Sequence, residues 1–401
     1  MTTRVLVIGA GPAGTRCALR VAARLPGAAV TLAGAEPALP YDRVGLSRYV
    51  AGDIEQEALI THRLADLSAA GVEFRAGTTV ETLDLPSRQA VTKSGKALDY
   101  DWCVLATGSR AVRLPFPGAD LPGVVPWRDL AESRAMLRAA REGGPAVVIG
   151  GGLLGLEAAA GLAARGMRVT VLHAVGWPME RQLDTEAGTL LADRLRGRGL
   201  KMIMRAATAS FEGKDRVEAV RLVDGTRIPA RLVVMAVGVR PNTDLARASG
   251  LAVGRGIAVD ASMRTSDPRV LAIGECAEVE GRIVGLVAPA MEHAEVAAAT
   301  VAGEAASWTA RADSAALKVT GAAVWSAGEV APEDADAVTL RAGDTYRGLW
   351  WRGSRLVGAV LYGDVAESAF FLRLIASGEA VASRADAALG SAWMEGLKDA
   401  A

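Results

Sequence analysis

The feature that most constrains this chain is a glycine-rich fingerprint that occurs twice, each time directly after a run rich in β-branched residues. Both copies follow the pattern Gly-x-Gly-x-x-Gly between a predicted strand and a predicted helix. The first glycine allows a tight turn, the second lets the backbone approach a pyrophosphate, and the third lets helix and strand pack closely. Two copies predict two Rossmann-like dinucleotide-binding domains, which typically pass electrons between two nucleotides. The six glycines are Gly9, Gly11, Gly14, Gly150, Gly152 and Gly155.

The composition is that of an ordinary globular protein, and 401 residues are enough for two or three domains. Lysine plus arginine equals aspartate plus glutamate, at 45 each, so the net charge gives no reason to expect nucleic acid or an anionic membrane as a partner. No apolar run approaches the ~20 residues of a membrane span. The N-terminus lacks the pattern of a signal peptide. We therefore expect a cytoplasmic protein.

Three widely spaced cysteines, Cys17, Cys103 and Cys276, form no Cys-x-x-Cys pair. Their spacing predicts free, buried or half-buried thiols rather than a disulfide framework, a zinc site or an iron–sulfur cluster. It also excludes a disulfide reductase, because no cysteine pair could receive electrons from a flavin. His62 and His293 lack the spacing of metal ligands and are expected to be surface or packing residues, so no metal site is predicted.

The order of predicted elements gives an α/β fold in which the second dinucleotide-binding domain is inserted into the first. Residues 1–115 and 243–315 are predicted to form the first domain, and residues 116–242 the second. Within the first domain, residues 71–83 and 90–93 are predicted as short strands of a β-meander. Residues 316–401 are predicted as a small α+β domain that serves as an interface for dimerisation or partner docking. Its tryptophans would either fill its own core or form a docking face: Trp325, Trp350 and Trp351.

An acidic residue late in the chain indicates that the first site holds FAD. Gly274 and Glu275 follow a buried strand, and an N-terminal fingerprint paired with such an acid is typical of FAD sites, where the acid contacts the ribityl chain. Glu36 is the acid nearest the end of the second strand and is the candidate for the adenosine ribose. A helix predicted to begin at Pro289 would aim its N-terminus at the flavin, where its partial positive charge stabilises the anionic reduced ring.

The second fingerprint is predicted to hold the nicotinamide nucleotide. The strand that follows it ends at His173, where an aspartate or glutamate would read the ribose 2′-hydroxyl. His173 could accept a hydrogen bond from the ribose of NADH or, when protonated, favour the phosphate of NADPH. The sequence leaves both readings open.

This order of motifs resembles the pyridine nucleotide-dependent flavoprotein reductases of the glutathione-reductase-like fold, a group that includes the rubredoxin and ferredoxin reductases. Within that group the chain is most similar to the FAD/NAD(P)-binding portion of the large subunit of NAD(P)H-dependent nitrite reductases. The likeness covers nearly the whole chain, and its later motifs are typical of that branch. The motifs are residues 36–48, 106–109, 150–157, 179–184, 235–244, 263–268, 273–278, 285–289, 317–321 and 356–364.

The resemblance implies roles for further residues. Arg43 and Ser47 would line the FAD site, and Arg128 would contact FAD. In related ferredoxin and rubredoxin reductases a lysine at the position of Arg48 pairs with the acid at the position of Glu157 near flavin N5, so the resemblance implies Arg48 and Glu157 as a catalytic pair. The other predicted nucleotide contacts are Pro12, Ala13, Val80, Ala106, Thr107, Gly108, Leu153, Leu154, Gly238, Ala288 and Pro289.

The resemblance implies an FAD-dependent NAD(P)H oxidoreductase that passes electrons to an iron–sulfur or haem protein. The expected acceptor is a nitrate or nitrite reductase catalytic subunit, or a ferredoxin-like or rubredoxin-like protein, and the expected setting is nitrate or nitrite assimilation. The chain has neither the cysteine-rich iron–sulfur segment nor the sirohaem module of complete nitrite reductase subunits, so we do not expect it to reduce nitrite itself.

Two alternatives stay open at this point. One is a rubredoxin or ferredoxin reductase that serves an oxygenase, and the other is a redox-sensing NAD(P)H-binding flavoprotein. His173 and Ala35 stand where the family often has acids, which leaves the preference for NADH or NADPH undecided. A homodimer is also left open.

Overall fold

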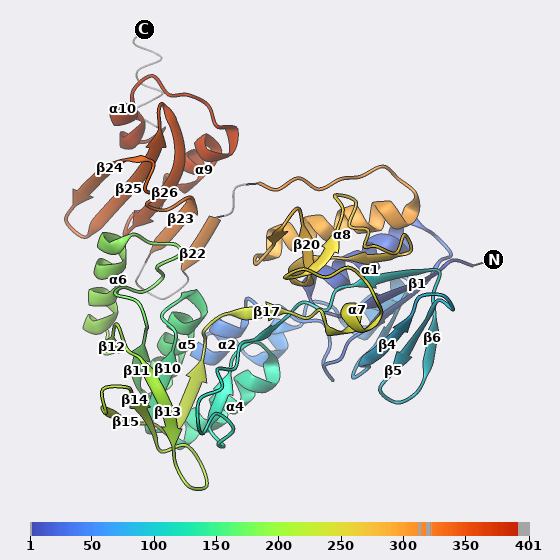
Figure 1. Cartoon of the computed structure of the whole chain (residues 1–401), viewed down its shortest axis with the longest axis horizontal. Helices are drawn as coiled ribbons and strands as arrows, with labels where there is room; N and C mark the ends of the chain where they lie inside the picture. The colour runs from blue at the N-terminus through green and yellow to red at the C-terminus, as the bar shows by residue number, and fades with distance from the viewer. Residues whose placement is uncertain (1, 312–313, 318–320, 322, 392–401) are drawn as a thin grey trace.

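The computed structural model describes residues 2–311, 314–317, 321 and 323–391. Figure 1 shows three bodies: a first unit near the N-terminus, a second unit inserted into it, and a C-terminal unit that lies over the second unit. Sheet membership defines the first two, because the strands of the first unit come from both sides of the second unit in the sequence. The predicted α/β class, with two Rossmann-like units and a small C-terminal domain, is confirmed. The exact domain boundaries stay a prediction.

The first unit is built on a five-stranded parallel sheet in the order β19-β7-β1-β2-β3. Alternate residues of β1 face opposite sides: Val5 and Val7 pack against helices α1 and α8, while Leu6 and Ile8 face a second core. That alternation explains the fully apolar β1, because both faces of the sheet are covered. The bounds are β1 Arg4–Ile8, β2 Ala29–Ala33, β3 Val72–Arg75, β7 Trp102–Leu105, β19 Val270–Ala272, α1 Pro12–Arg24 and α8 Val287–Ala302.

The predicted meander needs a correction. Residues Val72–Arg75 form β3, which pairs parallel with β2 at the edge of the main sheet and so is not part of a meander. The meander itself is antiparallel and consists of β4, β5 and β6. Val72 and Phe74 decide the outcome, because they pack into the core beneath α1 and extend it. The bounds are β4 Val80–Asp84, β5 Gln89–Thr92 and β6 Ala97–Asp99.

The second unit repeats the plan of the first. Its parallel sheet has the order β12-β11-β10-β16-β9, with the fingerprint strand β10 at the centre, and an antiparallel sheet, β13-β14-β15, corresponds to the meander. The bounds are β9 Val124–Pro126, α4 Leu130–Glu142, β10 Pro145–Ile149, α5 Leu153–Ala164, β11 Arg168–Leu172, α6 Thr185–Gly197, β12 Lys201–Ile203, β13 Thr208–Glu212, β14 Ala219–Leu222, β15 Arg227–Pro229 and β16 Leu232–Met235.

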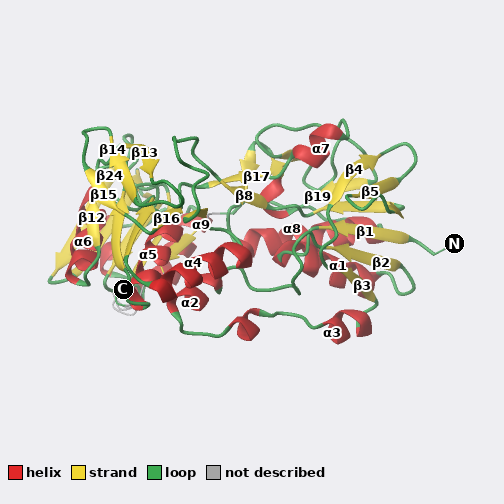
Figure 2. Ribbon diagram, turned by 90° about the horizontal axis from the view of Figure 1, so that it is seen from below, coloured by secondary structure: helices red, strands yellow, loops and turns green. Residues whose placement is uncertain are grey.

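Two adjacent strands carry the chain between these units. β8 Ser109–Ala111 leads out of the first unit and β17 Val239–Pro241 leads back, and the two pair antiparallel. Figure 2 shows them side by side between the two sheets. At their base, Thr107 Oγ1 donates to the Asn242 carbonyl and Asn242 Nδ2 donates to the Thr107 carbonyl, both at 2.8 Å. The outgoing and returning segments are therefore fastened to each other.

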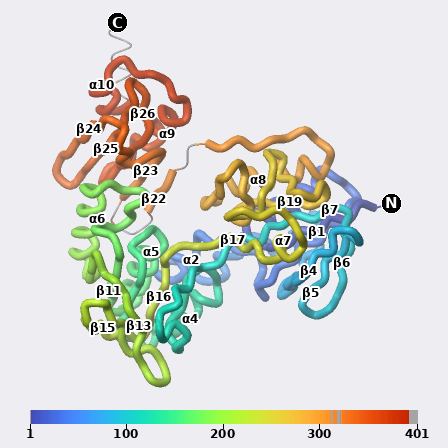
Figure 3. The backbone as a smooth tube through the Cα atoms, viewed as in Figure 1, coloured from blue at the N-terminus to red at the C-terminus, as the bar shows by residue number. Residues whose placement is uncertain are grey.

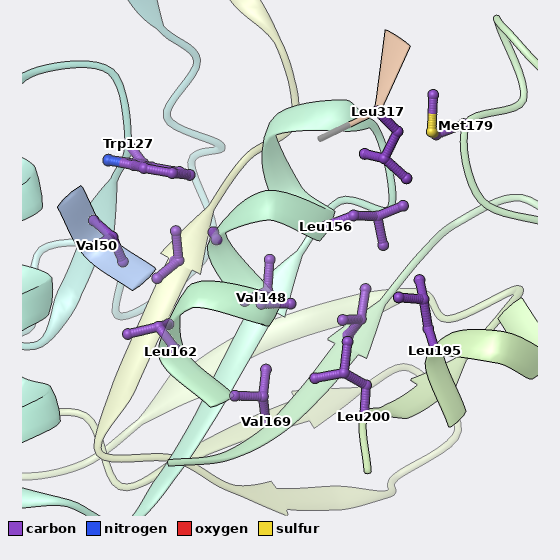
Figure 4. Close-up of a cluster of buried hydrophobic side chains, with 14 of the residues drawn as sticks. Val50, Trp127, Val148, Leu156, Leu162, Val169, Met179, Leu195, Leu200 and Leu317 are labelled. Carbon is purple, nitrogen blue, oxygen red and sulfur yellow. The ribbon is translucent and has the colours of Figure 1, made fainter. Parts of the chain in front are cut away.

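A short helix of the first unit packs on the second unit. Arg165, just after α5, donates to the carbonyls of Val50 and Tyr49 in α2. Figure 4 shows Val50 and Trp127 beside Leu162 of α5. The other short elements are α2 Leu46–Ala51, η1 Gln56–Leu59, α3 Leu64–Ala69, α7 Asp244–Ala248, β18 Ile257–Val259, η2 Gly274–Cys276, β20 Ala277–Val279 and β21 Arg282–Ile283.

The C-terminal unit packs on α6 of the second unit, as Figure 3 shows. Tyr346 Oη donates to Asp184 at 2.5 Å, Tyr362 Oη donates to the Leu190 carbonyl at 3.3 Å, and Leu317 joins the core beside Leu156 and Met179 (Figure 4). The bounds are β22 Ser314–Leu317, β23 Val324–Gly328, β24 Asp336–Ala342, β25 Thr345–Arg352, β26 Arg355–Tyr362, α9 Ser368–Ser377 and α10 Arg384–Leu389.

The structure buries all three tryptophans named above, so it supports the packing alternative and not the docking face. Trp325 and Trp351 lie in the unit's own core, and Trp350 lies in the core shared with the second unit. They therefore hold the C-terminal unit together and onto α6. The part of the chain that the structure describes contains no helix long and apolar enough to cross a membrane.

Candidate nucleotide-binding and redox site

One cavity of about 1330 Å³ runs through both units and joins the two fingerprints. Its lining includes Gly9–Gly14 from the first unit and Gly150–Leu154 from the second, and Ser314 to Ala316 of β22 contribute to it from the C-terminal unit. The volume exceeds the roughly 300–1,000 Å³ of a typical small-molecule pocket. The two predicted nucleotide sites therefore open into each other.

The backbone of the first fingerprint has the tight turn and the close helix–strand packing expected from the sequence. Gly9 has φ +115° and a Cβ there would lie 2.1 Å from the Ala106 carbonyl oxygen, so only glycine fits the turn. A Cβ on Gly14 would lie 1.9 Å from the Gly9 carbonyl oxygen, which shows how closely α1 meets β1. For a Cβ on Gly11 the nearest atom would be Nε of Arg43, 3.8 Å away, so the backbone at Gly11 is open to a ligand.

The second fingerprint has the same geometry. Gly150 has φ +113°, and a Cβ there would lie 2.2 Å from the Ala236 carbonyl oxygen. A Cβ on Gly155 would lie 2.0 Å from the Gly150 carbonyl oxygen. Gly152 has no atom within 4 Å of such a Cβ. Both loops thus leave room for a pyrophosphate at the middle glycine and nowhere else. Gly155 itself supports the loop from behind, whereas Leu153 and Leu154 line the cavity.

The helix N-termini at the cavity lack side-chain caps. α1, α5 and α8 begin after Gly11, Gly152 and Leu286, and among the described residues none of these three N-cap positions supplies a side-chain hydrogen bond to the first turn. By contrast, α4 and α6, of similar length, are capped by Asp129 and Asp184. Uncapped N–H groups that face a cavity are suited to bind phosphate or another anion. This donor set fits the pyrophosphates of two dinucleotides and an electron-rich ring at α8.

Glu36 and Arg43 form an ion pair at the adenosine end of the first site. Tyr41 Oη donates to Glu36 at 2.8 Å and accepts from the Leu130 N–H, which orients the carboxylate. Burial raises the pKa of Tyr41, so it stays a donor. Glu36 thus lines the cavity with an oriented carboxylate, while Arg43 lies against the phosphate loop at Gly11. Binding of the ribose by Glu36 stays a prediction.

Arg128 and Glu275 form a second ion pair deeper in the cavity. Ser109 Oγ also donates to Glu275, at 2.9 Å. The side chains of Arg128 and Ser109 come from separate segments and both donate to the carboxylate of Glu275, so its position is well determined. They line the cavity between the two fingerprints, which fits the hydroxylated ribityl chain of FAD.

The loop that carries Glu275 rests on a buried histidine. The Gly274 N–H donates to Nδ1 of His293 at 3.3 Å, and the ring of His293 packs edge-on against Trp308. His293 is fully buried, and this burial lowers its pKa to about 4. The imidazole therefore stays neutral at pH 7 and can accept this hydrogen bond.

The implied catalytic pair is partly placed. Ser47 of α2 and Glu157 of α5 line the cavity, and Arg48 follows Ser47 as an exposed residue of the same helix. The packing of α2 on α5 brings the two segments together. Their pairing stays a prediction.

His173 is engaged on both sides of its ring. Its Nδ1 accepts from the Gly151 N–H at 3.0 Å, and its Nε2 lies 3.0 Å from a carboxylate oxygen of Glu180, within ion-pair distance but without the alignment of a hydrogen bond. The ring is buried, while Glu180 is half-buried at the cavity wall. An acceptor role for Nδ1 requires that nitrogen to be unprotonated.

The remaining predicted contacts fall in two groups. Pro12, Ala13, Val80, Ala106, Thr107, Gly108 and Gly238 line the cavity. Ala288 and Pro289 do not, because α8 begins at Val287 and turns Leu286, Val287 and Ala290 toward the cavity instead.

Sequence reasoning missed three polar residues of the site: Ser109, Tyr41 and Glu180. Ser109 and Tyr41 belong to motifs that were recognised, but their partners are distant in sequence. Glu180 lies eight residues beyond the end of β11 at Leu172, and it reaches His173 because the Met179 N–H donates to the Gly151 carbonyl. No local pattern marks that contact.

The three cysteines are buried and free, as predicted. Burial raises the pKa of each thiol, to about 12 for Cys17, so they stay protonated. Their positions fit packing roles and no thiol chemistry.

The site combines two dinucleotide-binding fingerprints, the Arg128–Glu275 ion pair and one cavity that joins them. This arrangement is typical of oxidoreductases that bind two dinucleotides. Residues 3–300 match the family described as pyridine nucleotide-disulphide oxidoreductase, and residues 314–379 match the rubredoxin NAD+ reductase C-terminal domain. The chain belongs to the pyridine nucleotide-disulphide oxidoreductase family. It is an NAD(P)H-dependent oxidoreductase whose cofactors are FAD and NAD(P)H, as predicted.

The chain is similar to several characterised proteins. It is 41% identical to nitrite reductase [NAD(P)H] of Bacillus subtilis (strain 168), over 84% of this chain and 42% of that protein. It is 36% identical to the assimilatory nitrate reductase electron transfer subunit of the same organism, over 91% and 48%. Among solved structures, the ferredoxin reductase for the CYP199A2 system from Rhodopseudomonas palustris has a TM-score of 0.87, 30% identity, and coverage of 95% and 96%. The chain thus spans less than half the length of the two Bacillus subtilis relatives.

Proposed function

We propose that this protein takes a hydride from NAD(P)H onto FAD and passes the electrons to a separate iron–sulfur or haem protein, as the electron-transfer component of nitrate or nitrite assimilation. The observation that carries the proposal is the single cavity in which both fingerprints open into each other. That geometry allows the nicotinamide and flavin rings to meet in one space. The relatives named for nitrite reductase and for an electron transfer subunit support the setting.

The residues of the chain bind and orient rather than react. The uncapped ends of α1 and α5 bind the two pyrophosphates, Glu36 binds the adenosine ribose, and Glu275 with Arg128 positions the ribityl chain. The uncapped end of α8 places partial positive charge where the reduced ring carries negative charge. FAD, when bound, supplies the two-electron to one-electron conversion that such a transfer requires.

The test is anaerobic rapid mixing of the purified holoprotein with NADH or NADPH, followed by mixing with a nitrate or nitrite reductase catalytic component. Fast bleaching of the flavin followed by fast reoxidation is expected. Slow bleaching with both nucleotides and a stable long-wavelength band would favour the redox sensor. A protein that binds no flavin would contradict the proposal altogether.

A second candidate is a ferredoxin or rubredoxin reductase that serves an oxygenase. The match to the ferredoxin reductase over 95% of this chain and to the rubredoxin reductase C-terminal domain favours it. Reoxidation by ferredoxin or rubredoxin at least tenfold faster than by the nitrate or nitrite reductase component would select this function.

We also propose that Arg48 and Glu157 act as a pair beside the flavin. Glu157→Ala is expected to slow flavin reduction by NAD(P)H at least tenfold with little change in bound FAD, because Glu157 lines the cavity from α5, away from the FAD fingerprint. The measurements are the reduction rate and the flavin-to-protein ratio. Arg48→Lys should keep most of the rate, since it keeps the positive charge. Unchanged reduction kinetics in Glu157→Ala would rule the pair out.

A further inference from the structure

The end of β11 is where the two nicotinamide nucleotides can be told apart, because NADH carries a 2′-hydroxyl and NADPH a 2′-phosphate on the adenosine ribose. In this fold the residue after that strand faces the ribose. Here that residue is His173, and its ring is 8% exposed. A ring this buried offers little surface to a ribose, so another side chain at the cavity wall has to distinguish the 2′-hydroxyl from the 2′-phosphate.

His173 itself is not available to a ligand. Its Nδ1 lone pair accepts from the Gly151 N–H, and its Cγ would lie 2.9 Å from a Cβ on Gly151, so the ring is stacked against the phosphate loop. Its Nε2 faces Glu180 at 3.0 Å. His173 therefore fills the space between the phosphate loop and Glu180 and leaves no free edge for the ribose.

Glu180 is the acid that reaches the ribose position in place of the residue on the strand. Its side chain is 31% exposed, lines the cavity, and has one oxygen beside His173. The turn that carries it is tied to the phosphate loop, because the Met179 N–H donates to the Gly151 carbonyl at 2.9 Å. The phosphate loop, the histidine and the backbone turn that carries the acid are therefore held together.

The nearby cations are less suited to a 2′-phosphate. Arg181 lines the cavity but is exposed, and within the described part of the chain no side chain holds it in place. Arg205 lies against Gly176, outside the cavity lining. A carboxylate at this place accepts a hydrogen bond from a 2′-hydroxyl and repels a 2′-phosphate.

We propose that Glu180, which lies beside the buried His173 on a turn tied to the phosphate loop, makes this protein select NADH over NADPH. The inference rests on the proposed function, because it assigns the nucleotide of the same site. The inference adds the residue that distinguishes NADH from NADPH, Glu180, which lies in the turn after β11.

The test uses the full-length holoprotein and calorimetric titration with NAD+ and with NADP+. The wild-type protein should bind NAD+ at least about tenfold more tightly, which corresponds to about 1.4 kcal/mol. Glu180→Gln should reduce the ratio below about threefold, chiefly by tightening NADP+. Glu186→Gln, an exposed acid on α6 that is paired with Arg341 and lies outside the cavity lining, should leave the ratio unchanged.

The outcomes separate the two proposals. Equal affinity for both nucleotides in the wild-type protein, tighter NADP+, or an unchanged ratio in Glu180→Gln would overturn the role of Glu180 and leave the proposed function standing. Failure of both nucleotides to bind a protein that retains FAD would overturn the proposed function as well. Arg181→Gln adds a check, because loss of NADP+ binding there would show that the arginine, rather than Glu180, reads the 2′ position.

Discussion

Gly155→Ala is expected to leave FAD bound and to weaken NAD(P)H binding at least 100-fold. The new Cβ would lie 2.0 Å from the Gly150 carbonyl oxygen, a backbone atom that cannot yield without moving the phosphate loop. Because β10 and α5 belong to the second unit, the flavin site should keep its shape. The measurements are the flavin-to-protein ratio and the nucleotide dissociation constant.

Two other glycines serve as matched controls. Gly14→Ala introduces the same clash at the first fingerprint, 1.9 Å from the Gly9 carbonyl oxygen, and should instead produce a protein without flavin. Gly197→Ala, at the end of α6, places its Cβ in open space and should change neither site. Wild-type nucleotide affinity in Gly155→Ala would show that the second fingerprint is not the nicotinamide site.

The second large effect is a loss of stability in acid that depends on His293. The folded pKa of about 4 lies below the usual value of about 6.5, so between these values the unfolded chain binds a proton that the folded chain does not. Stability from this residue is therefore complete above pH 6.5 and is lost as the pH falls toward 4. Between pH 7.5 and pH 5 the loss should be about 2 kcal/mol.

The measurement is urea unfolding of the wild-type protein and of His293→Asn at both pH values. The variant can keep an acceptor for the Gly274 N–H but cannot titrate, so its stability should fall about 2 kcal/mol less than that of the wild type. Comparison of the two proteins cancels the opposing contributions of Glu132 and Asp184, whose pKa values are raised by burial. His62→Asn, at a partly exposed histidine, is the control. Equal pH dependence in wild type and His293→Asn would refute the assignment.

The sequence was sufficient for features whose geometry is local. Each fingerprint turn depends on the positive φ angle of its first glycine and on the close approach of its third glycine to the carbonyl of the first, two features that lie five residues apart in each fingerprint. The same holds for the apolar strands that are buried on both faces.

Features that depend on tertiary pairing were not accessible in this way. β3 is a short, half-exposed strand, and whether it joins the main sheet or a meander depends on which neighbour Val72 and Phe74 find. Glu180 reaches His173 only through a turn folded back on Gly151. The tryptophans of the C-terminal unit look alike in sequence, but only the packing on α6 assigns Trp350 to the shared core.

The paired crossing strands, β8 and β17, have a consequence for how such proteins diversify. The chain leaves and re-enters the first unit at one place, where Thr107 and Asn242 are hydrogen-bonded to each other. The second unit is therefore one contiguous insertion whose two ends lie side by side. Replacing this one contiguous segment would exchange the predicted nicotinamide site, but it would also replace Arg128, whose side chain pairs with Glu275 in the predicted flavin site. A segment that is exchanged between such proteins therefore has to keep an arginine at this position.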